Sequence, residues 1–412
     1  MRYIRFLKPP RIIQDDQSPT KCSLTCLITI TSDLGDSFLT EDASIDAETQ
    51  YEGGNWSNFK RFNWTNGMRT LPIKLPQTYL YTGNVTLRVG LNEFHSPAKC
   101  ETDKFEILFD KKSHGIVSAY SAPLDPDRER KEAERLIERR FELSGQRVIS
   151  VWEETGESIA RHVWDAGVAL SYHIDQVLAN PEYESPIANA LNPGPGTEGL
   201  RILELGTGCG IVGITLATLL PHASVILTDL PEASDIVTRN LSQAQPAKST
   251  TLRFQTLDWD DEELSALTDP IKPSEPAGPS EHSTPIKGPT FDVLVVADCT
   301  YNPDSSPALV RTMQRIAKIS PEVTIIVAMK KRHPSEDVFF DLMAESGFRL
   351  AEGDGVQIEL PCDEGCANEV VHVYVYRHRS YKGYAVAAAT AKQGARMRDE
   401  GGAQRKKKRR IG

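Results

Sequence analysis

The stretch Leu203-Glu204-Leu205-Gly206-Thr207-Gly208-Cys209-Gly210 decides how this chain folds. It joins an apolar run at 201–205, typical of a buried strand, to an apolar run at 211–220, typical of a helix. Glycines remove side chains where a backbone approaches a ligand, and a helix N-terminus offers free N–H groups. A dinucleotide-binding loop needs its third glycine where Ile211 stands, so this spacing argues against a nicotinamide site. Glycines that serve packing alone remain an alternative.

The chain beyond residue 200 alternates strand-like and helix-like runs, which predicts a parallel sheet covered by helices on both faces. The first five strand-like runs are 201–205, 224–229, 252–257, 291–297 and 323–328. The helix-like runs are 211–220, 232–243, 305–319 and 335–346, with a further one upstream at 163–178. Two last runs, 356–360 and 370–377, flank a turn-rich segment and predict an antiparallel pair. The prediction is therefore a sheet of seven strands.

Two of these strands end in residues suited to a nucleoside ligand. Asp229 ends the second strand, 19 residues after Gly210, where a carboxylate can accept hydrogen bonds from both hydroxyls of a ribose. Alternatively, Asp229 only caps the helix that starts near Pro231. The third strand ends in Leu257-Asp258-Trp259, where Trp259 offers a flat ring for an adenine or for packing.

At this point the chain resembles the seven-strand lysine methyltransferase family, which includes enzymes that modify valosin-containing protein, Hsp70 chaperones and elongation factors. Four segments carry the resemblance, which spans roughly residues 150 to 378. They are the Trp-Asp-Ala segment at Val163-Trp164-Asp165-Ala166-Gly167, the glycine loop at 203–213, the Leu-Asp-Trp at 257–259, and the Asp-x-x-Tyr signature in Ala297-Asp298-Cys299-Thr300-Tyr301. The glycine loop is generic to class I methyltransferases, whereas Asp-x-x-Tyr with Trp-Asp upstream is far more specific.

This resemblance implies a fold, a cofactor and a set of contacts. The fold is α/β, a Rossmann-like class I methyltransferase sheet with helices on both faces, and the cofactor is S-adenosyl-L-methionine. The residues expected to hold the cofactor are Trp164, Glu204, Gly206, Thr207, Gly208, Gly210, Asp229, Leu230, Asp258, Trp259 and Ala297. No metal is expected: Cys362, Cys366 and His372 lack the second cysteine pair of a common zinc site.

Asp298 and Tyr301 are the expected catalytic pair. A free lysine has a pKa of about 10.4, so only about one in a thousand is neutral at pH 7. Asp298, at the end of the fourth strand, can accept a hydrogen bond from the target amine, and Tyr301 can hold the same amine or close its pocket. Orientation is the expected role, since a carboxylate also stabilises the ammonium form. The alternative is that both residues cap the turn before Pro303.

The rest of the chain has a different composition. Residues 1–125 predict a β-rich module, because runs such as 22–31, 84–91 and 104–109 alternate polar and apolar residues. The densely charged segment 126–146 predicts a connecting helix, and the methyltransferase domain is expected at 147–379, opening on a strand at 147–152. Its segment 267–290, rich in Pro, Ser and Gly, predicts a disordered insertion, and 380–412 predicts a disordered basic tail.

Charge and composition limit the partners. The net charge is −10, yet residues from 396 onward carry eight basic and two acidic side chains, so the remainder carries about −16. This balance disfavours nucleic acid except through the tail, where residues 406–410 fit a nuclear localisation signal or a solvated tail equally well. No apolar run is long enough to span a membrane. We expect a cytoplasmic monomer, with the nucleus as a second location if the tail acts as a localisation signal, and a protein substrate that carries the target lysine.

Three functions remain to be separated. The first is an S-adenosylmethionine-dependent protein-lysine N-methyltransferase, for which Asp298 and Tyr301 are intact. The second is a small-molecule N-methyltransferase, which the Asp-x-x-Tyr signature disfavours. The third is a catalytically idle interaction protein that binds the cofactor and recruits partners through its N-terminal module.

Overall fold

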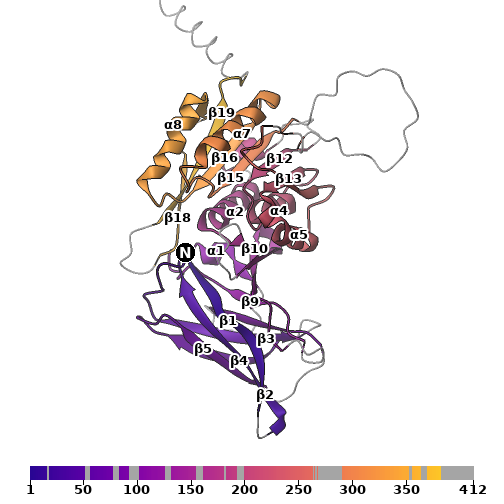
Figure 1. The fold of residues 1–412 in the computed structure, drawn as a ribbon, viewed down its shortest axis with the longest axis vertical. Coiled ribbons are helices and arrows are strands. Elements are labelled where there is room, and N and C mark those ends of the chain that lie inside the picture. Colours follow the sequence, from indigo (N-terminus) through magenta and orange to yellow (C-terminus); the bar gives the residue numbers. More distant parts are fainter. Residues whose placement is uncertain are drawn as a thin grey trace, which may run out of the picture.

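A computed structural model gives the fold of the chain (Figure 1). The structure describes residues 1–15, 18–51, 56–77, 83–91, 102–125, 131–154, 161–180, 182–192, 199–262, 264, 267, 290–351, 355–362 and 369–381. Most of the predicted insertion at 267–290 and of the predicted tail at 380–412, including the basic run at 406–410, lies outside these residues. The first residue of that segment, Leu267, is an exception to the prediction, because it is fully buried in the core.

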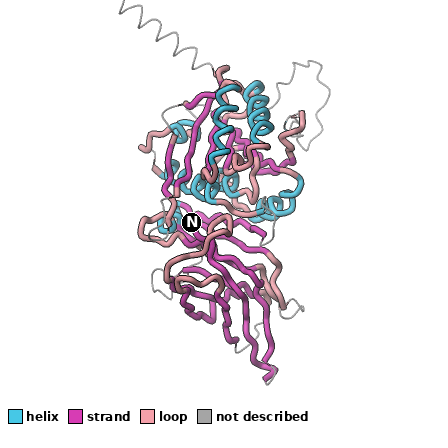
Figure 2. Tube along the Cα trace, turned by 60° about the vertical axis from the view of Figure 1, so that its left-hand side comes forward, coloured by secondary structure: helices cyan, strands magenta, loops and turns pink. Residues whose placement is uncertain are grey.

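The N-terminal part is built from two sheets, as the alternating pattern predicts (Figures 1 and 2). The first has the order β5 (Leu71–Gln77), β2 (Ser18–Thr31), β1 (Arg2–Asp15), β8 (Ile116–Val117). The second has the order β11 (Arg147–Glu154), β10 (Leu136–Leu143), β9 (Ala119–Ser121), β6 (Val85–Leu91), β3 (Ala43–Tyr51), β4 (Trp56–Trp64), and β7 (Asp103–Lys104) pairs with β10. The aromatic cluster of β4 divides between the two sides of its strand, since Trp64 is buried and Phe59 is exposed.

Two local predictions for this part are wrong. The connecting helix predicted at 126–146 is strand β10 where the structure describes it, paired along its whole length with β11. The prediction took the charged residues as a sign of exposure to solvent. Arg139, however, is fully buried and donates to Glu153 at 2.8 Å inside the sheet. The strand predicted at 104–109 is instead the short helix α1 (Phe105–Leu108), whose two terminal residues are both buried.

The C-terminal part is a twisted sheet with the order β14-β13-β12-β15-β16-β19-β17, and β18 pairs with β19. Its strands are β12 (Arg201–Leu205), β13 (Ser224–Asp229), β14 (Thr251–Thr256), β15 (Val293–Ala297), β16 (Thr324–Met329), β17 (Phe348–Leu350), β18 (Val356–Glu359) and β19 (Val370–His378). The first five are parallel and β19 is antiparallel to its neighbours. This order is the Rossmann-like class I methyltransferase fold, so that prediction is confirmed. Among the described residues the sheet has eight strands rather than seven, because the three-residue β17 was missed.

Helices cover both faces of this sheet. They are α2 (Asp165–Ala179), α3 (Pro186–Leu191), α4 (Ile211–Leu219), α5 (Ser234–Gln243), α7 (Ser306–Ile319) and α8 (Val338–Glu345), with 3₁₀ turns η2 (Ser144–Gln146), η4 (Pro231–Ala233) and η5 (Pro334–Asp337). Successive residues of a strand face opposite sides. Ile202 therefore joins the core beneath α2 and α4, whereas Leu203 joins the core beneath α7 and α8.

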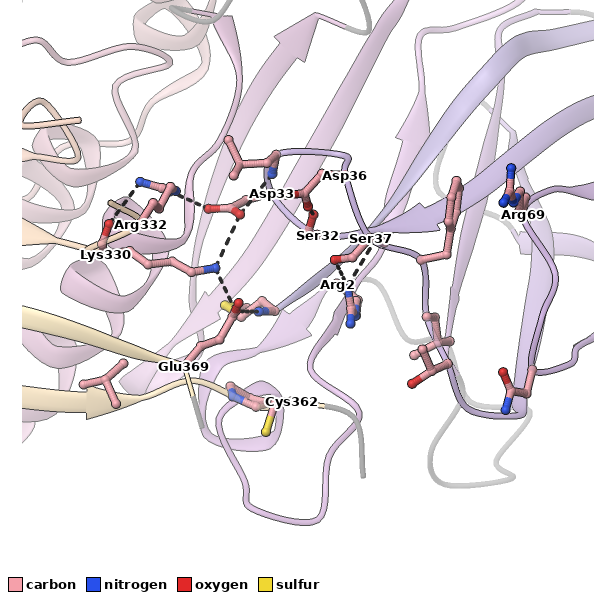
Figure 3. A pocket seen from close by; sticks show the side chains of 18 of the residues that line it. Arg2, Ser32, Asp33, Asp36, Ser37, Arg69, Lys330, Arg332, Cys362 and Glu369 are labelled. Atoms are coloured by element: carbon pink, nitrogen blue, oxygen red, sulfur yellow. Dashed lines mark hydrogen bonds and ion pairs between the residues drawn. The ribbon is translucent and has the colours of Figure 1, made fainter. Parts of the chain in front are cut away.

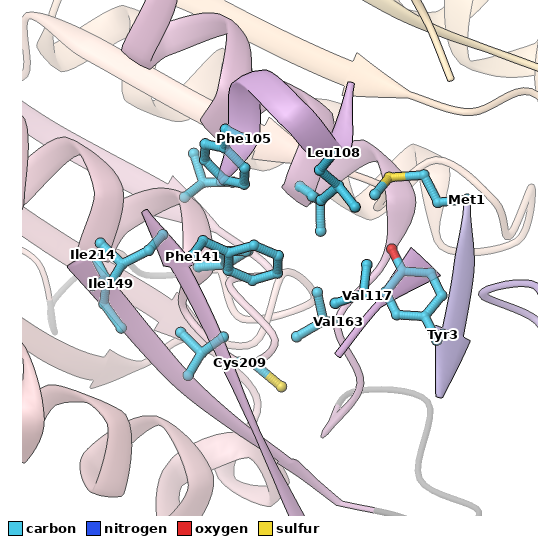
Figure 4. Close-up of a cluster of buried hydrophobic side chains, with 14 of the residues drawn as sticks. Met1, Tyr3, Phe105, Leu108, Val117, Phe141, Ile149, Val163, Cys209 and Ile214 are labelled. Atoms are coloured by element: carbon cyan, nitrogen blue, oxygen red, sulfur yellow. The ribbon is translucent and has the colours of Figure 1, made fainter. Parts of the chain in front are cut away.

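One hydrophobic core runs from the N-terminal part into the C-terminal part. Figure 4 shows Tyr3 and Val117 of the N-terminal sheets beside Val163, with Phe141 of β10 between them and Ile214 of α4. Burial of apolar surface stabilises by about 25 cal/mol per Å², so a continuous core holds the two parts in a fixed relation. The chain's N-terminus lies at this junction (Figure 1). Of the helices in the described residues, none has the length and apolar character needed to cross a membrane.

Candidate active site

The glycine loop takes the left-handed backbone that its residues allow. The φ angles of Gly206, Gly208 and Gly210 are 65°, 56° and 86°, values that cost other residues about 1–2 kcal/mol each. A Cβ added at Gly206 would collide with the sulfur of Cys299 and lie 3.1 Å from the Trp259 ring. Gly210 is the N-cap residue of α4, and Thr207 N donates to Thr228 O at 3.0 Å. The loop is thus folded tightly over the carboxyl ends of β12 and β13.

Glu204 lies beneath this loop. Its Oε2 accepts hydrogen bonds from Thr207 Oγ1 at 2.7 Å and from Gly213 N at 2.9 Å. The side chain is buried, and burial raises the pKa of Glu204 to about 8. These two bonds of Glu204 join the loop to the start of α4, and its predicted contact with a cofactor stays a prediction.

Asp229 has both carboxylate oxygens turned to the backbone of the site. Oδ2 accepts from Gly208 N at 2.7 Å, and Oδ1 accepts from Leu230 N at 2.8 Å. Burial raises the pKa of Asp229, and these two bonds oppose that effect. Each oxygen keeps a further lone pair for a hydroxyl donor. Leu230, the next residue, is exposed beside it.

The third strand leads to Trp259, whose ring borders the glycine loop. The backbone carbonyl of Trp259 accepts from Thr312 Oγ1 at 3.1 Å and from Arg315 Nη2 at 2.9 Å, which fixes this part of the backbone against α7. Asp258 is exposed, and its carboxylate accepts from Asp260 N at 2.9 Å. The structure thus brings Gly206, Asp229 and Trp259 to one edge of the sheet.

The end of β15 connects this edge to the predicted catalytic pair. Ala297 ends the strand, and two residues later the sulfur of Cys299 lies 3.5 Å from Leu205 O and 3.4 Å from Gly206 O. Asp298 stands between them with φ at 57°, an uncommon conformation for a non-glycine residue. Such strained residues occur preferentially at functional sites. Asp298 thus combines an uncommon backbone conformation with a place next to Cys299, the residue that touches the glycine loop.

The carboxylate of Asp298 is buried and paired with Arg332. Arg332 Nη1 donates to Oδ1 at 2.6 Å and Nη2 donates to Oδ2 at 2.7 Å. Burial raises the pKa of Asp298, while the Arg332 guanidinium works in the opposite direction. Tyr301 is half-exposed, and burial of its hydroxyl raises its pKa. The guanidinium of Arg332 also lies over the Trp164 ring, 5.6 Å from its centroid.

A cavity of about 670 Å³ opens at this pair. Trp164, Asp298, Tyr301 and Arg332 line it from the C-terminal part. The opposite wall comes from the N-terminal part, through residues that include Phe6, Leu7, Asp33, Leu34 and Gly35. Its volume is in the range of small-ligand and side-chain pockets. The structure thus unites three residues predicted for the site with a wall that the sequence did not indicate.

The residues that sequence reasoning missed are Asp33, Lys330 and Arg332. Figure 3 shows Asp33 between the two cations: Arg332 Nη2 lies 2.6 Å from Oδ2 and Lys330 Nζ lies 3.4 Å from Oδ1. Lys330 also donates to Asp165 at 2.8 Å. Burial opposes ionisation of Asp165, yet the neighbouring cations prevail and lower its pKa to about 2. The sequence did carry a signal for the two cations. Lys330 and Arg332 come just after the fifth parallel strand, at the edge of the sheet where ligands bind.

Metal ligands do not gather anywhere in the described residues: no group of three or more His, Cys, Asp or Glu side chains there could hold an ion. Cys362 and His372 are described, whereas Cys366 lies outside the described residues.

Comparison with known proteins finds the C-terminal part similar to one family. A model of the lysine methyltransferase family matches residues 144–272 and 280–346. A UPF0665 family protein of Schizosaccharomyces pombe is 29% identical over 188 residues, which are 45% of this chain and 47% of that protein. A calmodulin-lysine N-methyltransferase of Arabidopsis thaliana is 25% identical over 164 residues, 39% of this chain and 47% of that protein. The chain thus matches about half the length of each of these two relatives.

A solved structure of a precorrin-6y C5,15-methyltransferase from Geobacter metallireducens is similar at a TM-score of 0.31 and 14% identity, covering 50% of this chain and 87% of that one. The family match takes in the glycine loop, Asp229, Trp259 and Asp298 together. Through residues 144–272 and 280–346, this chain matches the lysine methyltransferase family.

Proposed function

We propose that this protein is an S-adenosylmethionine-dependent N-methyltransferase that modifies a lysine side chain of a protein substrate. One observation carries the proposal. The buried carboxylate of Asp298 and the half-exposed Tyr301 line a cavity, and Cys299 between them contacts the glycine loop. A nucleophile held in this cavity would therefore lie beside a cofactor held by the loop.

The residues at the sheet edge fit the proposed cofactor. The glycines of the loop carry no side chains that would obstruct a methionine moiety, and a Cβ at Gly206 would strike Cys299 and Trp259, which adjoin the loop. Asp229 keeps acceptor capacity for ribose hydroxyls, while Leu230, Asp258 and Trp259 would surround an adenine. Trp164 and Ala297 would border the sulfonium end, and Glu204 and Gly210 would support the loop. When bound, the cofactor supplies an electrophilic methyl group on its sulfonium.

The protein's task is then to hold a neutral amine in line with that methyl group. Asp298 would accept a hydrogen bond from the amine, using lone pairs that Arg332 leaves open. A lone carboxylate would favour the ammonium form. Because Arg332 compensates the charge of Asp298, the pair orients the amine without stabilising its proton to the same degree. Tyr301 would close the cavity over the lysine side chain, and the proton would leave to water.

The small-molecule alternative rests on the cavity itself, since a volume of about 670 Å³ also suits a free amine of moderate size. The half-exposed Tyr301 and the exposed Leu34 at its lining favour a protein segment that reaches in from the surface. The experiment must therefore separate labelled proteins from labelled small molecules.

The test uses tritiated S-adenosylmethionine and a cell extract with the wild-type protein or with Asp298→Ala. We expect labelled protein bands with the wild type and at least a 100-fold loss with the variant. Binding of S-adenosylhomocysteine, measured by calorimetry, should be unchanged in Asp298→Ala. Label confined to small molecules would support the alternative, and absence of label would favour an idle cofactor-binding protein. Undiminished labelling by Asp298→Ala would overturn the assignment of this residue.

A further inference from the structure

We infer that the N-terminal β-sheet module is a working part of the catalytic site, because its Asp33 positions Asp298 through Arg332. The inference rests on the proposed function for Asp298. It extends that function to a residue of a different part of the chain, for which the family resemblance has no counterpart.

Asp33 is held by a loop that is built for rigidity. The loop follows β2, and within it Ser32 N donates to Ser37 O at 2.9 Å and Gly35 N donates to Ser32 O at 3.1 Å. Arg5 of β1 fastens the same loop by donating to the carbonyls of Ser32 at 2.6 Å and Asp33 at 2.8 Å. The Asp33 side chain, almost fully buried, also accepts from Leu34 N at 3.0 Å. Its carboxylate therefore has a fixed place at the junction of the two parts.

Arg332 is the link between the two carboxylates. Its Nη2 lies 2.6 Å from Asp33 Oδ2 and 2.7 Å from Asp298 Oδ2, while Nη1 reaches Asp298 Oδ1 at 2.6 Å. A guanidinium is planar and rigid, so fixing one edge of the group fixes the other. With the ring of Trp164 on one side, the guanidinium has little freedom to turn. Loss of Asp33 would release one of its restraints and loosen the carboxylate that faces the substrate.

The same loop also shapes the cavity. Leu34 and Gly35, the two residues after Asp33, line it opposite Tyr301. The position of Asp33 thus determines both the orientation of Asp298 and the distance between the walls that receive the substrate. A displacement of about 1 Å in such an arrangement can cost on the order of 100-fold in rate.

A purely adhesive role for Asp33 is the competing explanation, and the chain offers a matched control for it. Tyr3 makes another hydrogen bond between the two parts, from its hydroxyl to Asp165 Oδ1 at 2.8 Å. Tyr3→Phe removes this bond without changing a contact of Asp33, Arg332 or Asp298. If Asp33 serves adhesion alone, Asp33→Asn and Tyr3→Phe should behave alike.

The experiment compares Asp33→Asn with Tyr3→Phe in the full-length protein. With tritiated S-adenosylmethionine and cell extract, we expect at least a 10-fold lower labelling rate in Asp33→Asn and less than a twofold change in Tyr3→Phe. Calorimetric binding of S-adenosylhomocysteine should be equal in both. Equal labelling rates in the two variants would overturn the inference.

A second measurement does not depend on activity. Cys299 is buried and adjoins Asp298, so loosening of Asp298 should expose its thiol to iodoacetamide. Peptide mass spectrometry should show alkylation of Cys299 at least fivefold faster in Asp33→Asn than in Tyr3→Phe, with Cys209 unchanged in both. Unchanged alkylation of Cys299 would contradict the inference even if the wild type labels nothing. Faster alkylation of Cys299 in Asp33→Asn, with no methyl labelling by the wild type, would support the positioning role of Asp33 and contradict the proposed methyl transfer.

Discussion

Arg332 donates to both carboxylate oxygens of Asp298, with distances of 2.6 Å to Oδ1 and 2.7 Å to Oδ2. Two parallel charge-assisted bonds of this kind are roughly twice as strong as neutral ones. Both partners are largely buried, and although burial lowers the pKa of Arg332, its bonds with Asp298 raise the pKa overall. The Arg332 guanidinium is consequently charged at neutral pH, and it opposes the effect of burial on the pKa of Asp298.

Removing the cation should destabilise the protein in a pH-dependent way. Arg332→Met leaves the buried carboxylates of Asp33 and Asp298 without this cation. Such a loss typically costs about 3–5 kcal/mol of stability. Burial already raises the pKa of Asp298, and loss of Arg332 raises it further. A carboxyl group whose pKa is raised on folding is destabilising above its unfolded-state pKa and harmless below it. The free energy of unfolding, measured in urea, should therefore fall further below the wild-type value at pH 8 than at pH 5. An equal deficit at both values would contradict this account.

Glu204 offers a separate test of a buried carboxyl group. Its ordinary pKa near 4.5 rises to about 8 in the folded protein. The folded state thus binds more protons than the unfolded state between these values, and stability should fall as pH rises through that window. Glu204→Gln cannot ionise but keeps an oxygen for Thr207 and Gly213. The variant should gain stability relative to wild type by up to about 1.4 kcal/mol per pH unit from pH 5 to pH 8. If the free energies of unfolding of the two proteins changed with pH by the same amount from pH 5 to pH 8, the raised pKa assigned to Glu204 would be refuted.

The sequence predicted the central strands β12, β13, β15 and β16 well because each is a mainly apolar run that is buried in the sheet. The boundaries of β12 and β13 coincide with the runs at 201–205 and 224–229. β17 escaped because three residues, two of them exposed, leave no pattern to detect. β10 was misread as a helix because Arg139 is buried in an ion pair, while the pattern analysis treats charge as a sign of solvent.

The site could be predicted only where its residues share one sheet edge. Gly206, Trp259 and Asp298 follow strands of one sheet, and Asp229 ends another strand of it, so their proximity follows from the topology. Asp33 and Arg332 lie 299 positions apart in different parts of the chain. Their contact depends on how two folded bodies dock, and neither local periodicity nor a motif encodes that arrangement.

Asp229 should contribute to cofactor affinity through hydrogen bonds to a ribose. Asp229→Asn removes the charge and replaces one acceptor oxygen by a donor. A hydrogen bond to a charged group is worth about 1.5–3 kcal/mol, so we expect S-adenosylhomocysteine to bind about 10–100-fold more weakly, measured by calorimetry. Asp235→Asn, an exposed residue on the neighbouring helix α5, is the control and should bind like wild type. Equal affinities of the two variants would exclude a ribose contact at Asp229.

The glycine loop should tolerate no side chain at Gly206. Gly206→Ala adds the strain of a left-handed φ of 65° and also a methyl group that meets Cys299 and the Trp259 ring. Gly145→Ala separates the two effects, because Gly145 has a similar φ of 72° with nothing within 4 Å of the added Cβ. The control should lose about 1–2 kcal/mol of stability from strain alone and keep its affinity for S-adenosylhomocysteine. Gly206→Ala should lose at least 10-fold in that affinity, since Cys299 and Trp259 must move out of the loop. Retained affinity in Gly206→Ala would mean that the glycine serves backbone conformation only, and that the cofactor does not approach the loop there.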